Sequence, residues 1–403
     1  MSVKGCLLIS RGGNWFKALE NTVKFWIVLW IVALTGMLAA CSDWDDPRAI
    51  RASRAAAAQG DILIGAVWPW GGAKGDLWQG IELAVEEINA GGGLLNRKLR
   101  ILKEDDESSL VKGRQIAQQF AENLDMVAVI GHLNSYIALP ASAIYQSAGM
   151  VFMTPGAHRY QINNQGYDLV FRTIPSNRSL GMQTAKYMAA QGHRRVVIYY
   201  IKDSSSQGLA NHFEQSVREL GLAVADRRSY MPGTQDFSNV IQNWKDLYQF
   251  DALFLAANMP EGAQFIVQMR KMGLDIPIVG GSGLDTHKLM EIAGTAAEGV
   301  VVPEIFVHDN NWPAYRHFSE IFYQKYRQSS GTQAPQGYDT IHLLAHAMRQ
   351  ANSSIPDKIA QALHGTQQWP GTTGEFTFDN KGDIPDKKIG MKVVRNGKFE
   401  TVQ

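Results

Sequence analysis

The chain alternates between short apolar runs and stretches that carry apolar residues at helical spacing. Residues 62–67 form an apolar run typical of a buried strand, and the stretch after it places Leu77, Ile81 and Ile88 on one helical face. The same order returns, with strands expected at 100–104, 126–130 and 151–153 and helices at 76–89, 111–123 and 136–147. Because parallel strands need crossover connections, this half predicts a parallel sheet covered by helices on both faces.

A second run of the same kind begins after Pro175. Helices are expected at 179–191, 208–220, 237–247 and 261–272, and strands at 195–201, 223–230, 252–256 and 277–280. Helices at 314–327 and 339–351 and short strands at 375–378, 392–395 and 398–401 complete the chain. Two successive parallel-sheet patterns in 403 residues indicate two α/β lobes, with boundaries near Pro175 and Pro303.

The first 40 residues have the pattern of an export signal rather than of a fold. Basic residues precede an apolar run at 25–38, which ends in Leu38-Ala39-Ala40-Cys41 and looks like a bacterial lipobox. We therefore expect residues 1–40 to be a lipoprotein signal peptide, Cys41 to be lipidated, and 41–60 to be the lipidated cysteine with a flexible tether. The alternative is an uncleaved anchor helix with an incidental cysteine. Both interpretations place the body outside the cytoplasm, in the periplasm or at the cell surface.

Composition excludes several classes of function. The formal net charge is +1, so the chain lacks the charge pattern of a nucleic-acid-binding protein. Its two cysteines, Cys6 and Cys41, both lie in the N-terminal segment, which leaves the body without disulfides or thiolate sites. His342 and His346 have metal-compatible spacing but lack the glutamate of a zincin and a third ligand. Without a nucleophile elbow or a complete nucleotide-binding loop, we expect no metal, no cofactor and no enzymatic activity.

Short segments in a fixed order make the body resemble a known family. They are Ile64-Gly65-Ala66-Val67 with Gly75-Asp76, Ile88-Asn89-Ala90-Gly91-Gly92, Asp105-Asp106, Val129-Ile130-Gly131-His132-Leu133, Thr154-Pro155-Gly156-Ala157, Phe171-Arg172-Thr173, Gln207-Gly208, Pro260-Glu261 and Phe376-x-Phe378-Asp379. This set is similar to the branched-chain amino-acid binding proteins of ABC transporters, in the type I periplasmic-binding superfamily. The resemblance spans about residues 61–402.

The resemblance implies two Rossmann-like lobes joined by three hinge crossings, near 174–177, 303–305 and 378–380. Lobe 1 would then comprise 61–174 plus 305–377, and lobe 2 would comprise 175–304 plus 378–403. A small-molecule ligand would be held between the lobes and passed to an ABC permease in the inner membrane. We also expect a monomer, attached to a membrane through lipid on Cys41.

The resemblance also implies first-lobe ligand contacts. The carboxylate-binding serine of the family falls on Ser135, with Tyr136 beside it, at the start of a predicted helix where backbone N–H groups favour anions. Gly156 and Ala157 match small residues whose backbone approaches the ligand. The plainer alternatives are that Ser135 caps its helix and that the other two form an ordinary turn.

Other expected contact positions depart from the family pattern. A threonine contact is His158 here, the first-loop tyrosine is Lys74, the aromatic before the second-lobe glycine is Gln207, the stacking aromatic is Asn258, and the acidic partner of a ligand ammonium is Ser282. A buried ammonium needs a counter-charge, and Ser282 does not supply one. We therefore expect the ligand to be an amino acid, an amide or a related small carboxylate, and not specifically a branched-chain amino acid.

Two further groups of residues complete the predicted site. Asp285 or Asp203 could replace the missing acidic partner from a neighbouring position. Trp68 and Trp70 could form an aromatic wall for the ligand, whereas packing of the loop against a helix is the alternative, above all for Trp78. The sequence thus predicts a transport-type binding protein. A ligand sensor or an envelope interaction protein on the same scaffold, not coupled to transport, is the alternative function.

Overall fold

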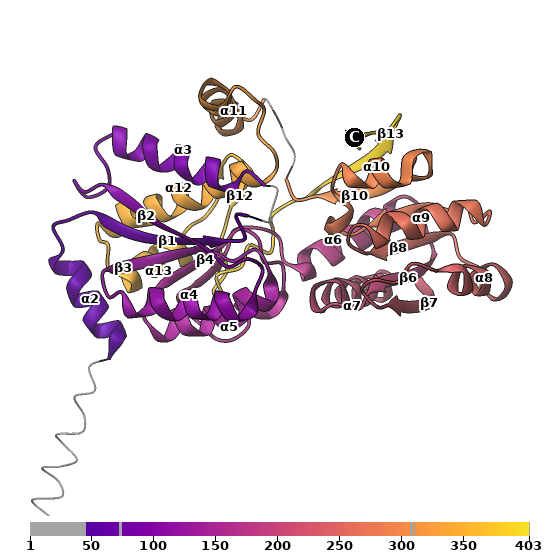
Figure 1. Ribbon diagram of the computed structural model, residues 1–403, viewed down its shortest axis with the longest axis horizontal. Helices are drawn as coiled ribbons and strands as arrows, with labels where there is room; N and C mark the ends of the chain where they lie inside the picture. Colours follow the sequence, from indigo (N-terminus) through magenta and orange to yellow (C-terminus); the bar gives the residue numbers. More distant parts are fainter. Residues whose placement is uncertain (1–45, 72–74, 307–308, 310, 403) are drawn as a thin grey trace, which may run out of the picture.

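The computed structural model describes residues 46–71, 75–306, 309 and 311–402, and it has two α/β lobes side by side (Figure 1). Each lobe is built around its own sheet, and separate apolar cores lie on the faces of the two sheets. The predicted fold class, two Rossmann-like lobes with parallel sheets flanked by helices, is confirmed. The predicted signal peptide, lipidated Cys41 and Lys74 lie outside the described residues.

The first lobe contains a five-stranded parallel sheet in the order β2-β1-β3-β4-β5. Its strands are β1 (Ile62–Trp68), β2 (Leu99–Asp105), β3 (Met126–Gly131), β4 (Val151–Thr154) and β5 (Val170–Arg172). The helices of this lobe are α3 (Leu77–Ala90), α4 (Leu110–Glu122), α5 (Ser135–Ser147), α11 (Pro313–Tyr326), α12 (Gln333–Ala351) and α13 (Pro356–His364). Every residue of β3 is buried, as expected for a strand with helices on both faces.

The second lobe contains a seven-stranded sheet in the order β14-β13-β10-β9-β8-β6-β7. Its strands are β6 (Arg195–Ile201), β7 (Ala223–Tyr230), β8 (Ala252–Ala256), β9 (Ile278–Gly280), β10 (Val301–Glu304), β13 (Gly390–Arg395) and β14 (Lys398–Thr401). The last two pair antiparallel, and the rest are parallel. The helices are α6 (Asn177–Ala190), α7 (Ser204–Glu219), α8 (Ser238–Leu247), α9 (Glu261–Lys271) and the short α10 (Lys288–Ala293). A small hairpin of β11 (Trp369–Gly371) and β12 (Gly374–Phe376) packs on the first lobe.

The stretch before the first strand is not the flexible tether that the sequence analysis expected. Residues Pro47–Ala57 form helix α2, which packs on the first lobe through the buried side chain of Arg51 (Figure 1). The tether prediction is therefore wrong for these residues. Its basis was a polar, alanine-rich composition, which cannot reveal that one arginine is used in a tertiary contact.

Three segments cross between the lobes. The first joins β5 to α6, the second leaves β10 towards α11, and the third runs from Ile384, in the first-lobe core, to Ile389, against a second-lobe core. The third crossing lies later than the predicted 378–380. Residues 379–383 still belong to the first lobe, because Arg172 N donates to Gly382 O at 2.9 Å and the buried Arg172 guanidinium pairs with Asp383 at 2.6 Å.

The third crossing carries a buried lysine. Lys387 Nζ lies 3.1 Å from Thr373 Oγ1 and 3.4 Å from the centre of the Phe376 ring, and burial lowers its pKa to about 7 despite the opposing effect of Asp339. Gln183 on α6 binds both the carbonyl oxygen of Lys387 and the N–H of Ile389. The crossing is thus fixed to both lobes by side chains.

No described helix is both long enough and apolar enough to span a bilayer.

Candidate functional site

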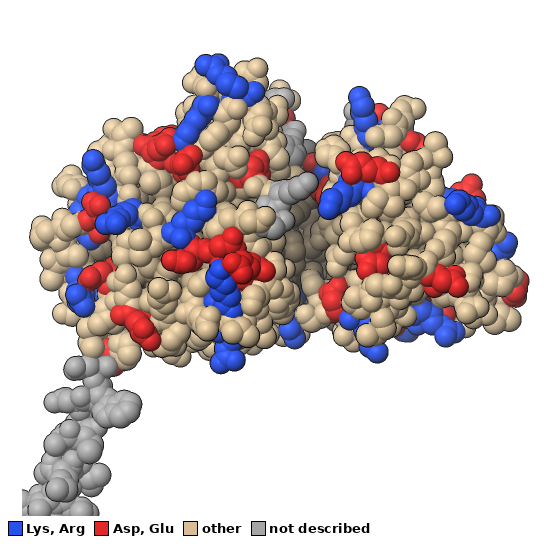
Figure 2. All heavy atoms as spheres, viewed as in Figure 1, with Lys and Arg blue, Asp and Glu red and all other residues tan. Residues whose placement is uncertain are grey.

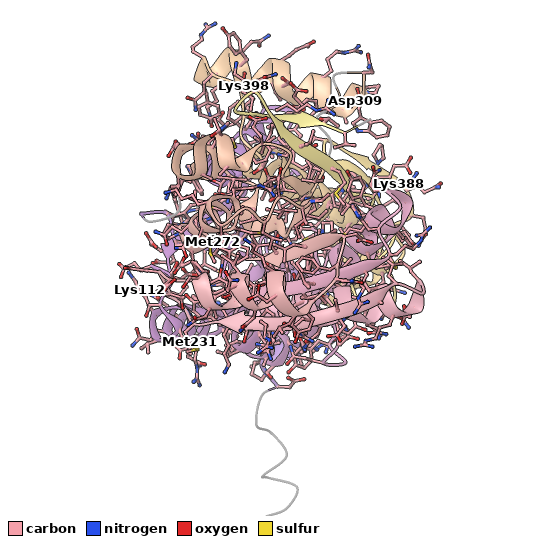
Figure 3. All side chains as sticks on the ribbon, turned by 90° about the vertical axis from the view of Figure 1, so that its right-hand side faces the viewer. Lys112, Met231, Met272, Asp309, Lys388 and Lys398 are labelled. Carbon is pink, nitrogen blue, oxygen red and sulfur yellow. The ribbon has the colours of Figure 1, made fainter. Side chains whose placement is uncertain are left out.

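Ligands of open parallel sheets sit where the carboxyl ends of the strands meet loops and helix N-termini. In the first lobe these loops follow β1, β3 and β4, and in the second lobe they follow β6, β8 and β9. Figure 2 shows a crevice between the two lobes, and Figure 3 views the molecule from the second-lobe end. We call the two loop sets the first rim and the second rim.

Trp68 forms the floor of the first rim. The last residue of β1, it is 2% exposed, and its indole Nε1 is buried without a hydrogen bond to any described residue. A Cβ on Gly156 would overlap the edge of this indole and would lie 3.0 Å from the Cα of Leu133. Only a glycine at position 156 therefore lets the loops after β3 and β4 close over the Trp68 ring.

Ser135 is the first residue of α5, as the sequence predicted, but it does not cap that helix. Asn134 holds the cap position, and no side-chain capping bond forms there. The Ser135 hydroxyl instead accepts a hydrogen bond from Arg159 N at 3.3 Å, and the residue is 9% exposed. The hydroxyl and the helix N-terminus thus lie beside the loop that contains Gly156, where an anion would be favoured.

Tyr136 points away from this cluster. It is 44% exposed, and its hydroxyl donates to Ser108 O at 2.6 Å, which connects α5 to the loop after β2. Burial is the main cause of its raised pKa. The contact serves loop packing, and the described contacts give Tyr136 no bond to the other first-rim residues.

Ala157 and His158 connect the first rim to the first crossing. Ala157 is fully buried, and its N–H donates to Thr154 Oγ1 at 3.1 Å. His158 Nδ1 lies 2.8 Å from Pro175 O, and the carbonyl of His158 accepts from Asn177 N at 2.7 Å. Burial lowers the pKa of His158 to about 4, so the ring is neutral at pH 7 and Nδ1 donates the proton.

Trp70 and Trp78 pack around an edge strand. Trp70 Nε1 donates to Glu104 O at 2.7 Å, and the two rings meet edge-on at 5.7 Å. The ammonium of Lys103 lies over both, 4.7 Å from the centre of Trp70 and 4.0 Å from that of Trp78. These contacts match the packing alternative for both residues. Trp68 packs against Gly156 in the loop after β4, and the Trp70 ring lies next to Trp68, with ring centres 6.3 Å apart.

A buried polar network supports the first rim, and the sequence analysis did not identify it. His132 Nδ1 lies 2.7 Å from the Asp106 carboxylate, and His132 Nε2 lies 3.1 Å from the Tyr145 hydroxyl. Burial lowers the pKa of His132 and raises that of Tyr145. This network joins the loops after β2 and β3 to helix α5. The sequence signal for this network was a pair of polar residues, Asp106 and His132, each directly after the end of a strand.

The second rim is organised around Asp203. Its carboxylate accepts from Ser205 N and Ser206 N, each at 2.8 Å, and so caps α7. It also accepts from the Ser206 hydroxyl and from Asn258 Nδ2 at 3.1 Å. Asn258 is exposed, and so is Gln207, which lies one turn into α7. Asp203 followed by three serines is an N-cap pattern that could have been found in the sequence.

Ser282 and Asn258 come together in the second rim. Ser282 begins a short 3-10 helix, η2 (Ser282–Leu284), and a Cβ on the next residue, Gly283, would overlap the Asn258 amide oxygen. Asp285 ends this turn and forms an ion pair with Lys392 at 2.7 Å, and Lys392 lies 3.6 Å from Glu304. The sequence could not reveal this pair, because Lys392 reaches the site through the antiparallel pairing of β13 with β10.

A cavity of about 860 Å³ opens between the lobes beside Asp285. The first lobe contributes Gly75, Asp76 and 330–333, and the second contributes 285–287, Glu304, Lys392, Phe399 and Thr401. Asp76 accepts from the N–H groups of Gly331 and Ala334. In the described part of the chain no three histidine, cysteine, aspartate or glutamate residues gather as metal ligands. Among the described residues predicted for the ligand site, Asp285 alone lines this cavity.

Comparison with known proteins gives a consistent result. A family described as periplasmic binding protein matches residues 62–398. The leucine-, isoleucine-, valine-, threonine- and alanine-binding protein of Pseudomonas aeruginosa is 28% identical over 310 residues, 76% of this chain and 81% of that protein. The Leu/Ile/Val-binding protein of Escherichia coli is 29% identical over 313 residues, 77% of this chain and 84% of that protein.

A solved structure is also similar. The ABC transporter substrate-binding protein of Desulfitobacterium hafniense, in complex with Leu, has a TM-score of 0.77 and 37% sequence identity. The match covers 85% of this chain and 100% of the Desulfitobacterium hafniense chain. The N-terminal helix α2 lies before the matched family region, which begins at residue 62.

Proposed function

The chain belongs to the periplasmic binding protein family, and from this premise we propose that it is the extracytoplasmic solute-binding component of an ABC importer. The family consists of solute-binding proteins rather than enzymes and works outside the cytoplasm. In the proposal, the chain takes an amino acid, an amide or a related small carboxylate between its lobes and presents it to a permease of the inner membrane. The leucine complex of the Desulfitobacterium hafniense protein supports an amino acid as ligand.

The arrangement of the first rim is the observation that supports binding of a carboxylate. Ser135 lies at the start of α5, and its hydroxyl accepts from Arg159 N in the loop after β4, where Gly156 packs against Trp68. A hydroxyl and unpaired backbone N–H groups at a helix N-terminus favour an anion. In this proposal the first rim holds the carboxylate, and closure of the second rim adds differential contacts that favour the closed state.

The second rim is proposed to set the ligand specificity. Its exposed polar residues, Gln207 and Asn258, stand with Ser282 where the family pattern has aromatic and acidic residues. Asp203 and Asp285 are each engaged with groups of the protein, the former with a helix N-terminus and the latter with Lys392. These contacts support a ligand whose second end is polar, bound through hydrogen bonds rather than by stacking on an aromatic ring.

We also propose that the mature protein is a lipoprotein anchored through Cys41. The support is the sequence Leu38-Ala39-Ala40-Cys41 after an apolar run with basic residues before it. Mass spectrometry of the N-terminal peptide from membranes tests this directly. A diacylglycerol-modified Cys41 is expected, and a peptide that retains residues before Cys41 would contradict it.

Thermal melting of the mature protein against amino acids, amides and small carboxylates tests the binding function. A ligand present at about 100 times its dissociation constant should raise the unfolding free energy by roughly 2.7 kcal/mol. A panel at millimolar concentrations that leaves the melting temperature unchanged would contradict the proposal.

The second candidate function is a sensor or envelope interaction protein on the same scaffold. The departures at Gln207, Asn258 and Ser282 favour it, because they remove side chains that match the ligand contacts of the amino-acid binding family. Ligand-dependent capture of a permease would support the importer. Ligand-independent capture of another envelope protein, with no uptake defect after deletion of the gene, would support the alternative.

A further inference from the structure

The N-terminal helix α2 is fixed to the first lobe by a buried arginine. Arg51 is 0% exposed, and its guanidinium donates to four backbone carbonyls. The distances are 2.8 Å to Ala148 O, 2.6 Å to Asn123 O, 2.5 Å to Met126 O and 2.6 Å to Ala121 O. Three of these carbonyls belong to the ends of α4 and α5, where the helix dipoles favour a cation.

Contacts on both sides of Arg51 fix the direction of α2. Arg48 bridges Asp168 and Asp357, and Arg54 pairs with Asp125 at 2.9 Å. A Cβ on Gly149 would lie 2.6 Å from the Cα of Arg48, so the glycine permits the close approach of the helix. All of these partners belong to the first lobe. The helix is therefore part of the rigid first lobe rather than a loose extension of it.

This docking limits the distance between Cys41 and the folded body. Only five residue steps separate Cys41 from Asp46, the cap of α2, and they span at most about 18 Å. If 41–60 were a flexible tether, its extended reach would be about 70 Å. Helix α2 also lies at the end of the first lobe that is farther from the second lobe (Figure 1).

We propose that α2 is a docked spacer that holds the first lobe close to a lipid surface while the second lobe stays free to move. The proposal rests on the lipid anchor at Cys41 proposed above. A groove of about 640 Å³ lies at the start of this helix. Apolar residues, among them Pro47, Ile50, Leu124 and Ile144, form most of its lining, and Gln118, Glu122 and Ser147 are its polar members. Because so few residues separate Cys41 from α2, the groove would lie at the bilayer interface, so the partner of this surface is lipid.

Energy transfer from a fluorophore on the protein to acceptor lipids in vesicles tests the proposal. The body contains no cysteine, so a single label can be placed at Ser147→Cys beside α2 or at Leu247→Cys on the far lobe, both exposed positions. In the mature lipidated protein, energy transfer to the lipid acceptors should be stronger from position 147 than from position 247. Arg51→Met should lower the transfer from position 147, whereas Arg54→Met, which removes an equal charge from the same helix but breaks only an exposed ion pair with Asp125, should change it far less.

A second variant keeps the test independent of the stability of Arg51→Met. A flexible Gly/Ser insertion of roughly 15 residues after Asp45 adds about 20 Å of root-mean-square reach without touching α2. It should reduce transfer from position 147 as far as Arg51→Met does. Equal transfer in the parent and insertion proteins would overturn the spacer.

The anchor and the spacer fail in different ways. If Cys41 carries lipid but Arg51→Met and Arg54→Met give the same transfer, the spacer is wrong and the anchor stands. If mass spectrometry of the mature N-terminus finds no lipid on Cys41, the anchor is wrong, and the inference fails with it.

Discussion

The two rims of the crevice are built differently. In the first rim, small buried residues and a buried tryptophan are packed so closely that a single added Cβ would not fit. The second rim is as tight at Gly283, where an added Cβ would lie 2.4 Å from Asn258 Oδ1, but it also has exposed polar side chains in Asn258 and Gln207. An added Cβ at Gly208 would meet only an ordinary contact, 3.5 Å from Asn177 Nδ2. The first rim is thus defined mainly by close packing, whereas the second rim adds exposed polar side chains to a packed loop.

The difference indicates a division of labour. A rim fixed by packing holds the invariant part of a ligand, because close-packed interiors tolerate little displacement. A rim of exposed polar groups can change its residues without disturbing the lobe beneath it. The first rim also continues into the first crossing through His158, so a ligand bound there is directly coupled to the hinge.

The largest effect is expected where packing is tightest. Gly156→Ala would bring its Cβ within 2.3 Å of the edge of the Trp68 ring, so the unfolding free energy should fall by roughly 2 kcal/mol and ligand affinity should drop at least tenfold. The matched change in the second lobe, Gly208→Ala, lies within α7 and should instead raise stability by about 0.5–1 kcal/mol. Chemical denaturation of both variants checks this contrast. Equal effects in the two lobes would contradict it.

The coupling of the first rim to the hinge should give a pH signature. The pKa of His158 is about 4 in the folded protein and about 6.5 in the unfolded chain. Between these two pH values the unfolded chain binds a proton at His158 and the folded protein does not. This contribution to stability is complete above about pH 6.5 and is lost as the pH falls towards 4. Between pH 7 and pH 5 the loss is about 2 kcal/mol.

His158→Gln isolates that contribution from those of other groups, including His132. The variant should lose less stability than the wild type between pH 7 and pH 5, measured by denaturant titration at each pH. Parallel curves for the two proteins would mean that His158 titrates in the folded state as it does in water.

A smaller effect is expected from the hydroxyl of the first rim. Ser135→Ala should weaken ligand binding several-fold, by roughly 1 kcal/mol, because one hydrogen bond to the ligand carboxylate is lost. The ligand-free melting temperature should barely move, since the hydroxyl accepts only one long bond, from Arg159 N at 3.3 Å, and does not cap α5. Calorimetric titration and thermal melting measure the two quantities. A parallel loss of affinity and stability would assign Ser135 a structural role.

The smallest effect is expected in the second rim. Asn258→Ala removes one hydrogen bond to Asp203, which keeps its bonds to Ser205 N, Ser206 N and the Ser206 hydroxyl. The unfolding free energy should change by less than about 0.5 kcal/mol, as is usual for an exposed side chain, and affinity should change only a few-fold. A loss of affinity larger than that of Ser135→Ala would reverse the proposed roles of the two rims.

The sequence predicted the alternating elements and both sheets because strands buried on both faces leave continuous apolar runs. It also placed Ser135 at the start of its helix. It missed α2, because only the tertiary contacts of Arg51 distinguish a docked helix from a polar tether. It likewise missed the pairing of Lys392 with Asp285, which depends on two strands about 90 residues apart in sequence. Long-range contacts of single polar residues leave no local periodicity.

The account depends on closure of the two lobes around a ligand. Nitroxide labels at Lys112→Cys and Met231→Cys would report it, since these side chains come from different lobes and project on the same side of the molecule (Figure 3). Pulsed electron–electron double resonance should show a shorter distance between the two labels when a ligand that raises the melting temperature is added. An unchanged distance distribution with the same ligand bound would contradict the account.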